Sequence, residues 1–340
     1  MSIEDLESIA LAMVAPGKGI IAIDESTNTI KKRFEAVGIE NTEENRRAYR
    51  ELLLTSPNLS EHISGAILYD ETIRQSTKDG VPFTQVMKKN GIIPGIKVDK
   101  GPVPLAGFPG DVVTEGLDGL RERLQEYYKL GARFAKWRAV IDIGKDIPSA
   151  YAIEANAQAL ARYAALCQEQ QIVPVVEPEV LMDGDHSIER CEAVTNETLQ
   201  VVFDQLHKQR VYLEGMILKP NMVISGKKAA NRASPEQVAQ ATVRCLRRHV
   251  PSAVPGIAFL SGGQASEQAT LHLSLMNQIG GLPWGLTFSY GRALQDAALK
   301  GWGGRAAGYA VGQKEYLKRA RLNGLAANGR YTADMENKAA

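Results

Sequence analysis

The sequence has few of the features that would assign it to several large classes of protein. Its 340 residues include three cysteines, Cys167, Cys191 and Cys245, without the spacing of a disulfide framework or a metal site. We therefore expect reduced thiols and a cytoplasmic location. No apolar run reaches the roughly 20 residues that a membrane-spanning helix needs. The opening MSIEDLESIALAM is too acidic for a secretory signal or a transit peptide.

Neither sign of charge is in excess, and metal ligands are sparse. Lys and Arg number 40 and Asp and Glu number 39, a balance that indicates neither a nucleic-acid nor a membrane partner. Asp183 and Asp185 beside His186 could suggest a cation site, but a polar loop is the more common explanation of such a group. The histidines show no ligand spacing, so we expect no bound metal. They are His62, His186, His207, His249 and His272.

Eight short apolar runs have the composition of β-strands. Their intervals leave room for a strand, a crossover helix and two loops. Each run ends at a polar or glycine-rich point. They span residues 19–24, 63–70, 92–99, 132–141, 172–180, 214–222, 256–263 and 285–292.

Helical patterns occupy the intervals between these runs. Ser149 precedes a segment with one apolar face, and Ser234 opens a capping box with Pro235 and Gln237. Alternating strands and helices predict a parallel α/β sheet. Because there are eight units and no GxGxxG motif near the first strand, we predict one (β/α)8 TIM barrel domain over residues 1–340. An extra N-terminal helix and C-terminal helices would surround it, and residues 331–340 would form a short flexible tail.

Charged residues gather where five of the expected strands end. Strands of a parallel barrel have no solvent-facing side, so these charges require an explanation. Some form i, i+2 pairs, which places both members on one face. Barrel enzymes keep catalytic groups at the carboxyl ends of strands, whereas a buried ion-pair network is the structural alternative. The residues are Asp24, Lys97, Asp99, Lys136, Arg138, Glu177, Glu179 and Lys219.

Lys219 is the most unusual of these residues. It ends an apolar run and precedes Pro220, which cannot donate a hydrogen bond to a sheet. Burial near a second cation disfavours the charged form of an amine, and a neutral lysine amine can attack a carbonyl to form a Schiff base. The alternative is that the side chain extends from the strand end into solvent.

Two further groups have the composition of anion-binding sites. Ser26, Thr29 and Arg33 follow the first run, and Arg138 in the fourth run adds a cation. Glycine turns follow the seventh and eighth runs, where barrels often bind phosphate. Ordinary turns and helix caps are the alternatives, but two anion sites around a lysine indicate a substrate with a phosphate at each end. The second group comprises Ser261, Gly262, Gly263, Ser289, Gly291 and Arg292.

From about Pro16 to Tyr331 the sequence resembles class I fructose-1,6-bisphosphate aldolases. The resemblance is carried by GKGIIAIDEST, ENTEENRR, GIKVDKG, FAKWR, VPVVEPE, LKPNMV, FLSGGQ and FSYGRALQ. It implies a lyase that cleaves fructose 1,6-bisphosphate reversibly to dihydroxyacetone phosphate and glyceraldehyde 3-phosphate in glycolysis and gluconeogenesis. It further implies a homotetramer that needs no cofactor.

The resemblance also implies individual roles. Lys219 would form the Schiff base, Glu177 would act as general acid/base, and Asp24 would handle the hydroxyl proton. Lys136 would aid proton transfer and keep Lys219 unprotonated, and Glu179 would orient Lys219. The ketose-end phosphate would be bound by Ser261, Gly262, Gly263, Gly291 and Arg292. Contacts to the other half of the substrate would come from Ser26, Thr29, Arg33, Lys97 and Arg138, with Arg46 as a further candidate.

The sequence departs from the family in two places. Asn28 and Thr29 stand where many members have glycine and serine. The chain ends YTADMENKAA, without the terminal tyrosine that many relatives have, so we expect the tail to contribute little to the chemistry. Another Schiff-base lyase or a transaldolase would not need two phosphate clusters, and a non-catalytic scaffold would not need charges inside a barrel.

Overall fold

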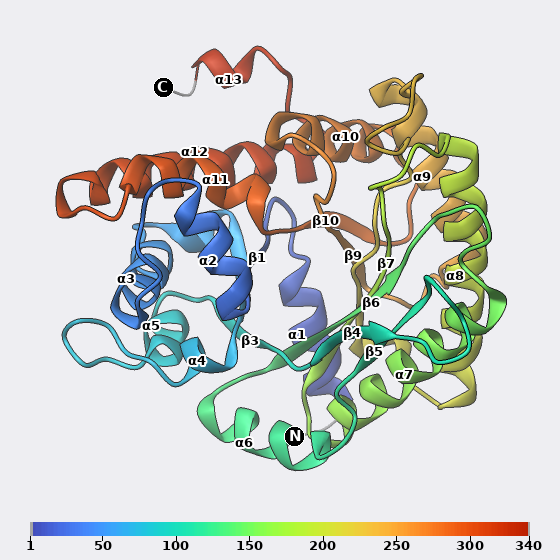
Figure 1. Cartoon of the computed structure of the whole chain (residues 1–340). Coiled ribbons are helices and arrows are strands. Elements are labelled where there is room, and N and C mark those ends of the chain that lie inside the picture. Colours follow the sequence, from blue (N-terminus) through green and yellow to red (C-terminus); the bar gives the residue numbers. More distant parts are fainter. Residues whose placement is uncertain (1–2, 339–340) are drawn as a thin grey trace.

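The computed structural model describes residues 3–338, which form a closed barrel of parallel strands surrounded by helices (Figure 1). The order around the barrel is β1-β2-β3-β6-β7-β8-β9-β10, and β10 closes against β1. Every barrel strand falls inside one of the predicted runs, so the predicted (β/α)8 fold is confirmed. The strands are β1 (Gly19–Ile23), β2 (Ile63–Leu68), β3 (Ile93–Lys97), β6 (Phe134–Ile141), β7 (Val173–Val180), β8 (Ile217–Leu218), β9 (Gly256–Phe259) and β10 (Gly285–Tyr290).

Several helices begin where the sequence supplies a side-chain cap. Ser149 accepts a hydrogen bond from the backbone of Ala152 at the start of α7, and Ser234 and Gln237 form the predicted capping box of α9. The helices are α1 (Ile3–Met13), α2 (Thr27–Glu35), α3 (Glu43–Leu54), α4 (Asp70–Ile73), α5 (Phe83–Lys89), α6 (Leu120–Leu130), α7 (Ala150–Glu169), α8 (Ile188–Lys208), α9 (Pro235–His249), α10 (Ser266–Ile279), α11 (Arg292–Trp302), α12 (Tyr309–Ala327) and α13 (Met335–Lys338). Short 3₁₀ turns span Leu59–Glu61, Leu213–Gly215 and Ala306–Gly308.

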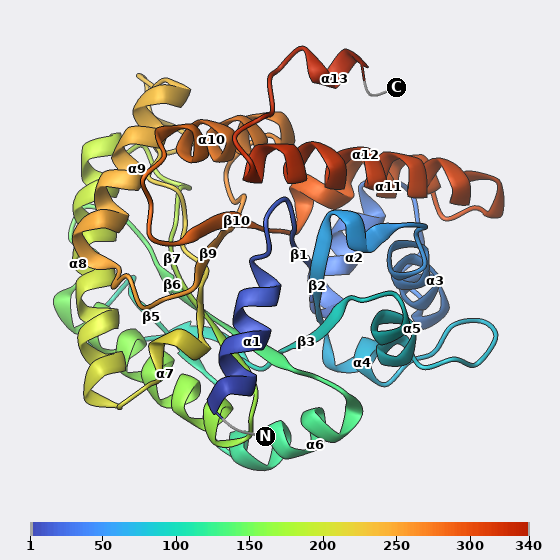
Figure 2. The ribbon, with the colours of Figure 1, turned by 180° about the vertical axis from the view of Figure 1, so that it is seen from behind.

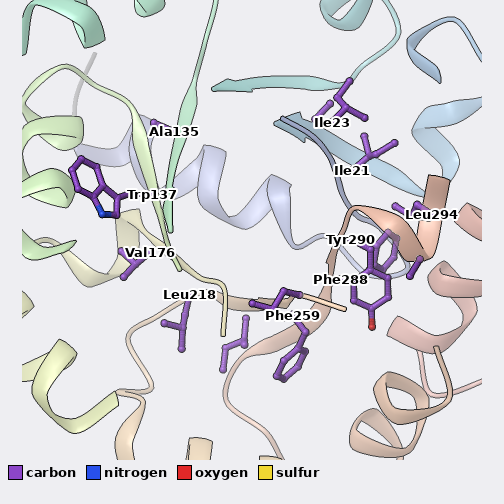
Figure 3. Packing of buried hydrophobic residues seen from close by; sticks show 14 of the residues in the cluster. Ile21, Ile23, Ala135, Trp137, Val176, Leu218, Phe259, Phe288, Tyr290 and Leu294 are labelled. Atoms are coloured by element: carbon purple, nitrogen blue, oxygen red, sulfur yellow. The ribbon is translucent and has the colours of Figure 1, made fainter. Parts of the chain in front are cut away.

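The core has two layers because strand side chains alternate in direction. One layer lies between the strands and the outer helices. It includes Ile21, Trp137, Val176, Leu218 and Phe259, which Figure 3 shows spread around the barrel wall. This layer packs the outer helices against the strands. The amino ends of these helices follow the carboxyl ends of the strands.

The second layer fills the amino-terminal half of the barrel interior. The predicted extra helix, α1, contributes Leu6, Ala10 and Met13 to the cluster that contains Phe134. Figure 2 shows α1 alongside the amino ends of the strands. A Cβ at Gly95 would lie 2.2 Å from the Phe134 ring, so glycine is required for the ring to cross the barrel. The cluster also contains Ile20, Ala22, Ile67, Val173, Val175, Ile217 and Ala258.

One part of the fold differs from what the sequence indicated, and a second concerns the expected tail. Strands β4 (Gly101–Pro104) and β5 (Val112–Glu115) form an antiparallel hairpin between β3 and β6 that was not predicted. Near the carboxyl end, Tyr331 is buried and its hydroxyl donates to Glu336 Oε1 at 2.8 Å. Glu336 also pairs with the buried Arg319. These contacts involve Tyr331 and Glu336 of the expected tail, whose flexibility stays a prediction; residues 339–340 lie outside the described part.

Candidate active site

A pocket of about 420 Å³ lies at the carboxyl ends of the barrel strands. It is lined by all but two of the residues that the sequence predicted for the site. A larger hollow of about 680 Å³ lies between the β4–β5 hairpin and α7. The predicted charges converge on the smaller pocket, where low exposure strengthens their interactions. Its predicted lining residues are Asp24, Ser26, Thr29, Arg33, Lys97, Lys136, Arg138, Glu177, Glu179, Lys219, Ser261, Gly262, Ser289, Gly291 and Arg292.

Four charged side chains form a buried ion-pair chain at the base of this pocket. Lys219 Nζ lies 3.2 Å from Glu177 Oε1, and the other oxygen of Glu177 lies 3.3 Å from Lys136 Nζ. Lys136 Nζ in turn lies 2.7 Å from Asp24 Oδ2. The side chains of Lys136, Glu177 and Lys219 are only 4–5% exposed. Cations and anions alternate, so each charge is compensated by a neighbour.

The buried ion-pair chain fixes the charge states of two of its four side chains. Burial alone would raise the pKa of Asp24, but the positive charges of Lys136 and Lys219 lower it well below its usual range. Burial alone would lower the pKa of Lys136, but the carboxylates of Asp24 and Glu177 raise it well above its usual range. Near neutral pH Asp24 is therefore a carboxylate, and Lys136 remains an ammonium rather than a free amine.

A second set of contacts surrounds this chain. Glu179, which was predicted to orient Lys219, forms an ion pair with Arg138. Lys97 Nζ lies 2.8 Å from Asp99 Oδ1, and Asp99 accepts backbone hydrogen bonds at 3.1 Å from Arg138 and Gly101. Asp99 therefore joins β3, β6 and the unpredicted hairpin. The role of Glu179 at Lys219 stays a prediction.

The glycine turn, defined here as Ser261, Gly262 and Gly263, follows β9, and α11 begins after the neighbouring strand β10. Gly263 has φ +76°, a conformation that L side chains rarely adopt. Gly291 precedes α11 and offers no side-chain cap, and Arg292 is the first residue of that helix. An uncapped helix start and a guanidinium are a favourable combination for a phosphate. By contrast, Ser26 accepts a hydrogen bond from Thr29 N and caps α2, as the structural alternative predicted.

Two predicted residues do not line the pocket. Arg46 makes two hydrogen bonds, of 2.8 and 2.6 Å, with the carboxylate of Glu71. Gly263 lies behind Gly262, against Met182. Their roles in binding stay predictions.

The sequence did not reveal a polar cluster around Glu25, which also lines the pocket. Glu25 pairs with Arg33 and with the buried Arg50, whose Nη2 lies 2.9 Å from Glu25 Oε2. Gln295 Nε2 donates to Glu25 Oε1 at 3.0 Å and to Ala22 O at 2.7 Å. Glu25, the second carboxylate of the IDEST segment, was the one sequence signal for this cluster. Its partners Arg50 and Gln295 lie 25 and 270 residues further along the chain. This cluster joins the end of β1 to α2, α3 and α11.

Other expectations concern what the protein lacks. Within residues 3–338 no group of three or more His, Cys, Asp or Glu side chains could hold a metal ion. Asp183 forms an ion pair with Lys227 at 2.6 Å, and all three cysteines are free and buried. No helix in the described part of the chain is both long and apolar enough to span a bilayer.

A closed parallel barrel with buried lysines and carboxylates at the carboxyl ends of its strands defines a TIM-barrel enzyme with a lysine-containing active site. The family model for class I fructose-bisphosphate aldolase matches residues 5–340. The chain belongs to this family, and the enzyme is a carbon–carbon lyase.

Individual relatives agree over nearly the full length. The chain is 68% identical over 332 residues to a probable fructose-bisphosphate aldolase class 1 of Xanthomonas campestris. The aligned region covers 97% of this chain and 99% of the relative. It is 55% identical to the fructose-bisphosphate aldolase of Drosophila melanogaster, over 97% of this chain and 92% of the relative. A solved aldolase of Plasmodium falciparum superposes with a TM-score of 0.96 at 50% identity, over 97% of this chain and 95% of that one.

Proposed function

We propose that Lys219 is the nucleophile of a Schiff-base mechanism for reversible cleavage of fructose 1,6-bisphosphate. The observation that carries the proposal is the buried ion-pair chain, in which Lys219 Nζ contacts Glu177 while Lys136 is held as an ammonium between two carboxylates. A lysine that keeps its proton cannot attack a carbonyl. Lys136 therefore supplies a fixed positive charge, and Lys219, which can pass its proton to Glu177, is the nucleophile.

The first half of the reaction joins the substrate to Lys219. Lys219 first passes a proton to its ion-pair partner Glu177, and the free amine then attacks the ketone carbon. Transfer of a proton from the nitrogen to the new alkoxide gives a neutral carbinolamine. Glu177, 3.2 Å from Lys219 Nζ, donates a proton to the carbinolamine hydroxyl, which leaves as water and yields a protonated imine. The positive imine nitrogen is the electron sink, so no step needs a metal.

The second half breaks the carbon–carbon bond. Asp24, ionised because of the neighbouring lysines, takes the proton of the C4 hydroxyl. The C3–C4 bond then breaks, its electron pair moves toward the imine to form an enamine, and glyceraldehyde 3-phosphate leaves. Protonation of the enamine and hydrolysis of the imine release dihydroxyacetone phosphate and restore Lys219.

We further propose that the two phosphates occupy the ends of the pocket. The glycine turn, Gly291 and Arg292 offer backbone N–H groups and a guanidinium to the ketose-end phosphate. The other phosphate would meet the cationic side of the pocket formed by Lys97, Arg33 and Arg138. These side chains already have carboxylate partners, so the phosphate must compete with them.

The experiment that tests these roles compares Lys219→Met, Asp24→Asn and the unchanged enzyme. Lys219→Met should abolish both cleavage and proton exchange at dihydroxyacetone phosphate. Asp24→Asn should lower cleavage by about 10²-fold or more, while the dihydroxyacetone phosphate adduct on Lys219 still forms. Cleavage by Lys219→Met at more than about 1% of the unchanged rate would contradict the assignment of the nucleophile.

A cytoplasmic homotetramer that needs no metal completes the proposal. It rests on the family to which the chain belongs. Sedimentation equilibrium would identify a tetramer directly, and a monomer at micromolar concentration would contradict it. Dialysis against EDTA should leave cleavage unchanged, whereas a loss restored by zinc would contradict the mechanism.

A further inference from the structure

Met182 lies directly behind the glycine turn. Its side chain is buried, and within the described part of the chain it is not among the residues that line the active-site pocket. A Cβ placed on Gly263 would lie 2.0 Å from Cγ of Met182, and one placed on Gly262 would lie 2.8 Å from its Cε. The backbone of the turn therefore rests on the methionine side chain.

The backbone around Met182 is held from two sides. The preceding residue, Leu181, donates its backbone N–H to Ile141 O of β6 at 2.8 Å. The carbonyl of Met182 accepts a hydrogen bond of 2.7 Å from the backbone of Lys227 in the loop after β8. The Asp183–Lys227 ion pair connects the same two loops. Because its backbone is fixed, Met182 provides firm support for the turn.

The end of β7 and the residues that follow it thereby contact both Lys219 and the glycine turn. Glu177 contacts Lys219, and Glu179 Oε1 would lie 3.1 Å from a Cβ on Gly262. Met182 follows in the same segment and supports Gly263. The residues from 177 to 182 therefore fix the separation between the nucleophilic amine and the glycine turn.

We propose that Met182 is a positioning residue that holds the glycine turn where it can bind the ketose-end phosphate while Lys219 reaches the carbonyl carbon. This inference rests on the proposed function. Methionine is unbranched and fills irregular gaps through its volume. A smaller side chain would let the turn recede from the amine, whereas a side chain of similar volume would keep it in place.

The test uses two ligands that differ only in the phosphate. The half-saturating concentration for borohydride trapping on Lys219 is measured with dihydroxyacetone phosphate and with dihydroxyacetone. Met182→Ala should raise the value for the phosphorylated ligand about tenfold and leave the value for dihydroxyacetone within about twofold. Met182→Leu should stay within about twofold for both, because the volume is conserved.

A matched control separates this effect from general loss of packing. Met87 in α5 is also buried, and Met87→Ala should leave both half-saturating concentrations unchanged. If Met182→Ala does not fold, Met182→Val should show a smaller shift of about threefold in the same direction. Equal shifts for the two ligands, or no difference from Met87→Ala, would overturn the role of Met182. An unchanged enzyme that traps neither ligand on Lys219 would instead overturn the proposed function.

Discussion

The two halves of the barrel interior are built from the same strands, yet they have opposite chemistry. At the amino end of the barrel, called the closed end below, Ile20, Val175 and Ile217 pack with α1 and the Phe134 ring. At the carboxyl end, called the open end below, inward positions further along the same strands carry the buried ion-pair chain. A charge at the closed end would lie among apolar side chains without a partner, whereas each charge at the open end has one. The apolar half supports the barrel, and the charged half keeps reactive groups out of bulk water.

The strongest way to break this division is to remove a charge from the open end. Lys136→Met should lower kcat by about 10²–10⁴-fold, because proton transfer loses a positioned cation. It also leaves Asp24 and Glu177 without the ammonium between them. Steady-state cleavage assays measure the loss, and Val175→Ala in the apolar half is the control that should keep kcat within about threefold. A Lys136→Met enzyme within tenfold of the unchanged rate would contradict the division.

The reverse change removes packing from the closed end. Phe134→Ala should lower the free energy of unfolding by about 3–5 kcal/mol, because the ring fills the barrel against Gly95. Urea denaturation measures the effect, and kcat of the folded fraction should remain within a few-fold. If kcat fell as far as in Lys136→Met, the two halves would not be separable.

Acid should lower the stability of the fold through His272, which lies outside the pocket. Burial lowers the pKa of His272 from 6.5 to about 4, and its Nδ1 lies 2.6 Å from Gln264 Oε1, next to the glycine turn. The unfolded chain binds this proton more readily, so the stabilisation is present above pH 6.5 and is lost as the pH falls toward 4. The unfolding free energy should drop by a few kcal/mol over that window, and His272→Gln should flatten this part of the profile. Parallel profiles for the two proteins would contradict the assignment.

A smaller effect is expected at the rim of the charged half. Arg292 begins α11 and lines the pocket, so Arg292→Ala should raise the KM for the bisphosphate by about tenfold. Its charge-assisted hydrogen bonds to phosphate, rather than the carbon–carbon cleavage step, account for that loss. An unchanged KM would remove Arg292 from the phosphate site.

The sequence was most informative where a local pattern conflicts with burial. Lysines and glutamates inside apolar strands were visible as anomalies, so the gathering of charges at the carboxyl ends of the strands could be predicted, with an ion-pair network as the structural alternative. The barrel itself was predicted from the eight alternating strand and helix units. Hairpin β4–β5 was missed because Pro102 and Pro104 are typical of a loop. Arg50 and Met182 stand in no motif that the sequence analysis singled out. Only the folded chain brings Arg50 to Glu25 and Met182 to the glycine turn.

The central claim is that Lys219 reacts while Lys136 keeps its proton. Borohydride reduction in the presence of dihydroxyacetone phosphate, followed by peptide mapping with mass spectrometry, tests it most directly. We predict one reduced three-carbon phosphate adduct, on the peptide that contains Lys219, and an unmodified Lys136. An adduct on Lys136, or on neither lysine while cleavage activity is intact, would contradict the mechanism.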